Sequence, residues 1–166
     1  MERTDPMRKH LVLLFALVLG LVVAAPASAT VTHLPFTTED HLVSAVDGTT
    51  TVDGAGNIHV RGSVWQMQVV SDSPYLAGDV TVVINYNLDP VTMTGTMWGT
   101  STQLPDAFDG GFTTHWTGTF TGDAAVWTGR GVGQGFGELA GMQMRYTVAW
   151  APFGDVMDGF LFTPGR

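Results

Sequence analysis

Three side chains in this sequence are of types that could assist proton transfer. Glu138 ends a glycine-rich stretch, and Asn85 and Tyr146 lie in runs of alternating polar and apolar residues. A carboxylate whose pKa is raised by burial can act as a general base, and an amide or a phenol can orient a bound water beside it. Such residues would suit an isomerase or a cyclase, provided that they face a cavity. The alternative is that Glu138 is an exposed turn residue, as glutamates usually are.

His59, Arg61 and His115 form a second group that could carry chemistry. The histidines of the chain do not have a metal-site spacing such as His-Glu-x-x-His, so we expect no metal site. If Trp116 faces the interior of the fold, strand alternation turns His115 outward, and it places His59 and Arg61 opposite Val60. A shift of one residue in register would bring all three polar side chains inside. We expect the outward register, and the sequence leaves the inward one open.

Five glycines stand at alternate positions from Gly129 to Gly137. The order Gly-x-Gly-x-x-Gly of dinucleotide-binding turns is not matched, and no P-loop lysine follows, so we expect no nucleotide cofactor and no other cofactor. In a strand, all five glycines would lie on one face. Such a ribbon is typical of a strand that bends sharply, as at a barrel corner, or that large neighbouring side chains cross closely.

The binding chemistry that suits this chain best is that of a small apolar ligand. An eight-stranded barrel is just wide enough to hold side chains or one small molecule. Strand alternation selects the expected lining, with Met side chains adaptable to a flexible ligand. These residues are Val82, Ile84, Tyr86, Trp116, Phe120, Met142, Met144 and Tyr146. The alternatives are that the same side chains simply fill the core, or that exposed Trp rings bind glycans.

Short runs rich in Thr, Val and Gly, separated by turn residues, predict an all-β fold. Short hairpin connections favour an antiparallel up-and-down barrel of about eight strands, because a sheet of this size must close or split into layers. The expected strands are residues 36–46, 58–71, 80–88, 91–103, 112–121, 124–137, 141–151 and 159–163, with 47–56 as a loop or a short strand.

The beginning of the chain has the pattern of a secretory signal peptide. Arg3, Arg8 and Lys9 precede an apolar run over 11–25, and Ala27-Ser28-Ala29 has the small residues of a cleavage site. We therefore expect a signal helix over 1–29 and a single barrel domain over 30–166. The mature protein would be secreted, either to the extracellular space or to the periplasm or cell envelope.

The charge balance limits the partners of the mature domain. The formal net charge of the whole chain is −8, and no lysine follows residue 29. Nucleic acids and anionic membranes need a basic surface, so we expect neither as a partner after cleavage of the signal. The chain has no cysteine, which excludes disulfides and thiol catalysis. The oligomeric state is not indicated.

Three segments resemble small exported bacterial β-barrel proteins with the allene oxide cyclase-like, or calycin-like, barrel. They are Met97-Trp98-Gly99-Thr100, Gly110-Gly111-Phe112 with Trp116-Thr117-Gly118-Thr119, and the run Gly133-Gln134-Gly135-Phe136-Gly137-Glu138-Leu139-Ala140-Gly141-Met142. The resemblance covers residues 57–163 and implies a barrel fold. The active-site residues of the cyclases have no match here, so their activity is not implied. We favour a binding protein over an enzyme.

Overall fold

The computed structural model describes residues 31–122, 126–151 and 154–163. The predicted signal peptide, residues 1–29, lies outside the described residues. Within the described residues, no helix has the length and apolar character needed to cross a bilayer.

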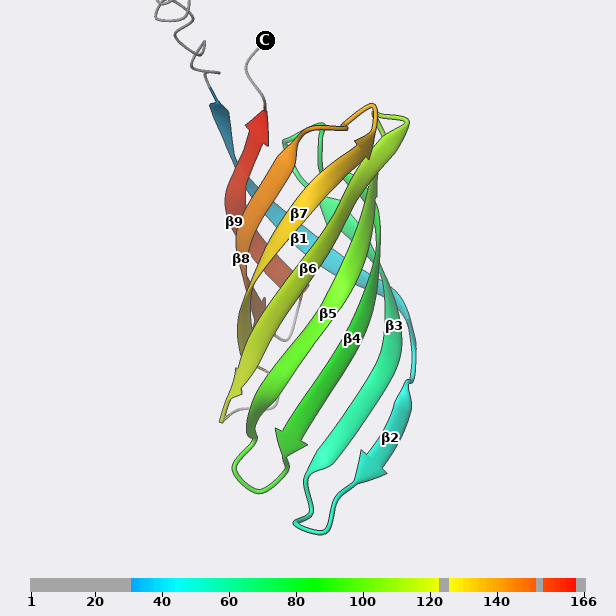
Figure 1. Cartoon of the computed structure of the whole chain (residues 1–166), viewed down its shortest axis with the longest axis vertical. Coiled ribbons are helices and arrows are strands. Elements are labelled where there is room, and N and C mark those ends of the chain that lie inside the picture. Colours follow the sequence, from blue (N-terminus) through cyan, green and yellow to red (C-terminus); the bar gives the residue numbers. More distant parts are fainter. Residues whose placement is uncertain (1–30, 123–125, 152–153, 164–166) are drawn as a thin grey trace, which may run out of the picture. The chain divides into compact units, whose positions relative to one another are not determined.

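In the described part of the chain, nine antiparallel strands follow one another in up-and-down order, and eight of them close a ring (Figure 1). The all-β, up-and-down expectation is thereby confirmed. Along the ring from β3 to β9, each strand pairs with the next one in the chain. The strands are β1 (Thr32–Val46), β2 (Thr49–Val52), β3 (Ile58–Val70), β4 (Gly78–Asp89), β5 (Thr94–Pro105), β6 (Gly110–Thr121), β7 (Trp127–Gly137), β8 (Gln143–Ala151) and β9 (Gly154–Thr163).

Strand β1 closes the ring by pairing with two different strands. Residues 32–40 pair with β9, and residues 39–46 pair with β3. Asp40 therefore lies where β1 passes from one partner to the other, opposite both Asp155 on β9 and Val69 on β3. The short strand β2 adds to the beginning of β3 and is not part of the ring.

Glycines and aromatic rings alternate around the inside of the barrel. Gly131 on β7 lies between Trp116 on β6 and Tyr146 on β8, and its missing Cβ would collide with the Tyr146 ring. In the same way, a Cβ on Gly99 would lie 2.7 Å from Trp116 Cζ2. The large rings therefore occupy the space that side chains on the neighbouring strands would need. At Gly131 the ribbon therefore lets a large neighbour cross closely, whereas Gly135 and Gly137 of the same ribbon lie against the backbone oxygens of Leu139 and Asp109.

One end of the barrel, formed by the loops after β3, β5 and β7, is filled with side chains. Leu76, Phe112 and Leu139 are at most 2% exposed there. Backbone hydrogen bonds join these loops, from the Asp106 amide to the Ala77 carbonyl and from the Glu138 amide to the Asp109 carbonyl. We call this the closed end.

The opposite end carries aromatic rings that are only partly buried. Trp65 packs against Trp150 with their ring centroids 5.6 Å apart, and Tyr86 packs edge-on against Phe120 at the same separation. All four rings border the buried core and retain partial exposure. We call this the aromatic end.

The structure differs from the sequence expectations at three places. Strand β9 begins at Gly154 and is much longer than the strand expected over 159–163. Strand β5 begins at Thr94 rather than at 91, after a turn in which Met93 has a positive φ of 54°. A bulge between Val60 and Ser63 shifts the register of β3, so that Val64 lies on the face opposite Val60, whereas simple strand alternation would put both on the same face.

The contact between Gly131 and Tyr146 yields a stability prediction. Gly131→Ala places a methyl group against the Tyr146 ring, and overpacking of this kind costs about 1–3 kcal/mol. We expect a lower midpoint of denaturant unfolding with an unchanged m value. Gly54→Ala is the matched control, because no atom lies within 4 Å of the added Cβ.

A double-mutant cycle tests the cause of that loss. In a Tyr146→Leu background the ring is absent, so the cost of Gly131→Ala should shrink markedly. An equal cost in both backgrounds would show that the backbone, and not the ring, requires glycine at this position.

Candidate functional site

The barrel encloses a small cavity of about 40 Å³ at its centre. Its wall combines tryptophan rings with two buried aspartates, Asp40 on β1 and Asp155 on β9. The two aspartates are only 4% and 8% exposed, and they are direct cross-strand partners. This pair of carboxylates in an otherwise largely apolar interior is the strongest candidate for a functional site.

The two carboxyl groups have different environments. Asp40 Oδ1 accepts a hydrogen bond of 3.0 Å from the Thr38 hydroxyl, whereas Asp155 Oδ1 is buried with no hydrogen-bond partner among the described residues. Burial raises the pKa of Asp40 to about 6, despite opposing effects of Thr38 and of the nearby His41. Burial, and then the charge of Asp40, raise the pKa of Asp155 to about 8. Burial therefore favours the protonated form of both carboxyl groups, and the charge of Asp40 adds to this effect at Asp155.

A short chain of hydroxyl groups borders the same cavity. The Tyr146 hydroxyl lies 3.2 Å from Thr114 Oγ1, which in turn is hydrogen-bonded to Ser101 Oγ. Burial raises the pKa of Tyr146 to about 12, so its hydroxyl stays protonated and can donate a hydrogen bond. The cavity wall thus holds an acid, a carboxylate and hydroxyl groups close to one another.

The eight residues expected to line a ligand cavity all belong to the interior, but they do not all meet at one place. Five of them line the central cavity: Val82, Ile84, Trp116, Met144 and Tyr146. Tyr86 and Phe120 lie together at the aromatic end. Met142 is buried in the turn that follows β7, at the closed end.

The polar candidates Asn85 and Glu138 do not line the central cavity. The Asn85 side chain accepts a hydrogen bond of 3.0 Å from the Gly62 amide and so stabilises the bulge of β3. The exposed Glu138 carboxylate accepts a hydrogen bond of 2.9 Å from the Asp109 amide. This bond joins two loops of the closed end. Of the three residues proposed to assist proton transfer, only Tyr146 lines this cavity.

The side chains of His59, Arg61 and His115 have the expected outward register, and not the inward one that the sequence left open. His59 pairs with Asp53 at 3.1 Å on the outside of the barrel, and hydrogen bonds with Asn87 and Asp53 raise its pKa. The Arg61 guanidinium lies 4.8 Å from the centre of the Trp98 ring, and His115 is exposed. These polar side chains therefore do not form a site inside the barrel.

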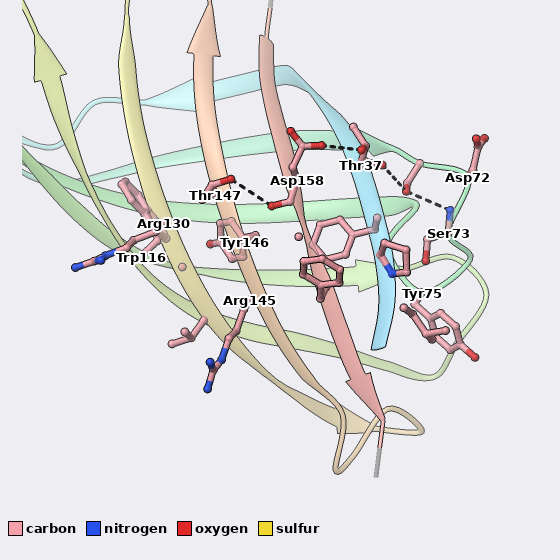
Figure 2. Close-up of a pocket in the computed structure, with 18 of the residues that line it drawn as sticks. Thr37, Asp72, Ser73, Tyr75, Trp116, Arg130, Arg145, Tyr146, Thr147 and Asp158 are labelled. Atoms are coloured by element: carbon pink, nitrogen blue, oxygen red, sulfur yellow. Dashed lines mark hydrogen bonds between the residues drawn. The ribbon is translucent and has the colours of Figure 1, made fainter. Parts of the chain in front are cut away.

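A second hollow lies on the outer face of the strands β6 to β9 and extends to the loop after β3. This groove has a volume of about 1330 Å³ and is also lined by residues 34–37 of β1. Its wall combines outward side chains of the strands, such as Arg130 and Arg145, with inner-face residues and the loop residues 71–75. Figure 2 shows Arg130 and Arg145 extending from neighbouring strands, and Asp158 held by Thr37 through a hydrogen bond of 2.7 Å. The groove is broad and open, and its polar groups do not converge on one point.

Sequence reasoning missed the aspartate pair. Asp40 lies within the strand expected over 36–46 and was not assigned to a site, and Asp155 lies between the strands expected over 141–151 and 159–163. The signal was nevertheless present, since Phe36, Thr38 and Asp40 alternate along β1 and share its inner face. In β9 the same period puts Asp155 on the face of Met157.

Metal binding is not indicated by the described residues, among which no group of three His, Cys, Asp or Glu side chains could hold an ion. Comparisons with protein-family models, with curated proteins and with solved structures found no match. The ring of eight antiparallel strands agrees with the architecture that the sequence resemblance implied. Membership of the allene oxide cyclase-like family stays a prediction.

The raised pKa values yield a prediction for stability. An aspartate whose pKa is higher in the folded than in the unfolded protein binds more protons when folded, so stability falls as pH rises. For Asp155 this loss of stability runs from the ordinary pKa of 3.8 to the raised pKa of about 8. Relative to the wild type, Asp155→Asn should gain stability over this window by up to about 1.4 kcal/mol per pH unit.

Urea denaturation at several pH values between 5 and 9 measures this difference. Asp79→Asn is the matched control, because it makes the same chemical change at an exposed aspartate of strand β4. If wild type and Asp155→Asn gave parallel curves of stability against pH, Asp155 would not carry a raised pKa.

Proposed function

We propose that this protein is an exported small-molecule-binding protein whose ligand enters at the aromatic end and reaches the central cavity. The observation that carries the proposal is the difference between the two ends. Phe112, Leu76 and Leu139 are fully or almost fully buried at the closed end. At the other end Trp65 lines the central cavity and packs against Trp150, and both rings remain partly exposed. Half-buried aromatic rings around a cavity are typical of ligand sites.

The packing of the interior limits how such a ligand binds. Ligand pockets commonly measure about 300–1,000 Å³, and the central cavity measures about 40 Å³. The cavity therefore suits one end group of a ligand, with the remainder of the molecule lying against the rings of the aromatic end. A ligand enclosed entirely within the barrel would require several core side chains to move.

An apolar fluorescent probe tests the proposed entry. N-phenyl-1-naphthylamine should gain fluorescence on binding, and Phe120→Ala should weaken its affinity by about tenfold, since loss of one large apolar contact is worth roughly 1.5 kcal/mol. Phe108→Ala is the matched control, because Phe108 is a partly buried ring stacked on Tyr75 at the closed end. Absence of binding, or an equal loss in both variants, would contradict entry at the aromatic end.

An enzyme of the isomerase or cyclase type is the second candidate, favoured by the two carboxyl groups of unequal pKa in one cavity. Such a pair can supply one acid and one base at neutral pH. The test is base-catalysed ring opening of 5-nitrobenzisoxazole. An acid–base site would accelerate the reaction, and both Asp40→Asn and Asp155→Asn would abolish the acceleration. Asp79→Asn is the control. If Asp40→Asn and Asp155→Asn reacted as fast as this control, the result would count against an enzyme that uses the carboxyl pair.

Glycan binding, the third alternative, needs two or more exposed and coplanar aromatic rings. The one outward tryptophan of the described barrel strands, Trp98, is covered by the Arg61 guanidinium. Trp65 and Trp150 meet at 55°, so they do not offer one plane. These observations give the glycan alternative less support than the small-molecule site.

A further inference from the structure

We propose that the ligand carries a primary ammonium group, and that Asp40 and Asp155 bind this group within the central cavity. The inference rests on the proposed function and adds the chemical class of the ligand. It starts from the buried carboxyl pair, whose two members lie opposite each other on neighbouring strands.

Among the described residues, no positive group lies inside the barrel beside the pair. His41, which follows Asp40 in the chain and whose charge lowers the Asp40 pKa, is exposed. Arg61, Arg130 and Arg145 are all exposed, and the described strands contribute no lysine. The titratable groups of the cavity wall are Asp40 from β1, Asp155 from β9 and Tyr146 from β8, while β3 to β7 contribute none. Burying carboxylates without a countercharge is costly, and a cation in the cavity would offset that cost.

One acceptor of the pair is directly available to a ligand. Asp155 lines the cavity, and its Oδ1 atom is buried with no hydrogen-bond partner among the described residues. Buried polar atoms in folded proteins nearly always have a partner, so an atom without one indicates a missing donor. An ammonium group has three N–H donors, and a hydrogen bond between an ammonium and a carboxylate is stronger than one between neutral groups.

The remaining wall is suited to an organic cation. Trp65, Trp116 and Trp127 line the same cavity as the aspartates. Indole rings attract cations through the negative charge of their faces, and the attraction increases when the cation is desolvated. Calcium, by contrast, needs six to eight oxygen ligands, which two carboxylates and a few hydroxyl groups do not supply.

The size of the cavity selects the kind of ammonium group. A volume of about 40 Å³ holds a group the size of –NH₃⁺ with its first carbon. A trimethylammonium group is bulkier and offers no N–H donor to Asp155. The cavity therefore favours a primary amine, whose apolar body would lie toward the aromatic end.

Isothermal titration calorimetry at pH 7 tests the inference with methylamine, n-butylamine and 2-phenylethylamine, and with 2-phenylethanol as the uncharged analogue of the last. We expect at least one amine to bind, and 2-phenylethylamine to bind about tenfold or more tightly than 2-phenylethanol. Asp155→Asn should weaken amine binding by about tenfold or more and change alcohol binding less than threefold. Asp79→Asn should change neither.

Proton release provides a second readout that does not depend on folding differences. The ammonium binds the ionised pair, so the proton held by Asp155 passes to the buffer. Titrations in phosphate and in Tris should therefore show the release of up to one proton per amine bound, and Asp155→Asn should release fewer.

The outcomes separate the inference from the function on which it rests. Equal affinity for amine and alcohol, both unchanged in Asp155→Asn, would overturn the ammonium site and leave the binding barrel standing. Amine binding that survives in both Asp40→Asn and Asp155→Asn would also overturn it. If the amines, the alcohol and N-phenyl-1-naphthylamine all failed to bind, the ammonium site and the proposed function would fall together.

Discussion

The interior of this barrel depends on one steric constraint, the alternation of glycines with large rings around its inner surface. A ring on one strand lies over the glycine of the next, as Tyr146 lies over Gly131 and Trp116 over Gly99. Phe36 and Gly159 repeat the arrangement where β1 joins β9, with Phe36 Cζ 2.8 Å from a Cβ built on the glycine. Eight strands enclose a limited volume, and these three rings occupy the space that a side chain on the paired residue would need. The loss of strand propensity at the glycines is offset by burial of the rings.

This packing also explains why the cavity is small and where it lies. Rings and methionines fill most of the lumen, and the cavity remains where short side chains replace them, beside Asp40, Ser101 and Asp155. The position of the aspartates follows from ring closure. Asp40 stands where β1 leaves β9 for β3, and Asp155 is opposite it near the beginning of β9. Closure of the barrel thus brings together two carboxyl groups that are far apart in the sequence.

The barrel could be predicted from the sequence because its signals are local. The period of two in residues 112–121 fixed the inner face of β6, and turn residues marked most hairpins. The aspartate pair could not be predicted in the same way. It requires knowing that β1 pairs with β9 and in which register, which depends on contacts across the whole chain. The hydrophobic pattern also did not mark Asp40 and Asp155 as interior residues, because charged residues ordinarily lie on the surface.

Two buried carboxyl groups without an internal cation are difficult to explain by stability alone. Asparagine or threonine at position 155 would fill similar space without the cost of burying a charge. The closed end shows that this chain can pack apolar side chains densely, since Phe112 and Leu76 there are fully buried. The carboxyl pair therefore lies where packing alone would favour neutral residues. Buried charged groups at one place in an otherwise well-packed apolar core are typical of functional sites. The same features, namely a raised pKa, an acceptor without a donor and surrounding indole rings, all favour a positively charged ligand group.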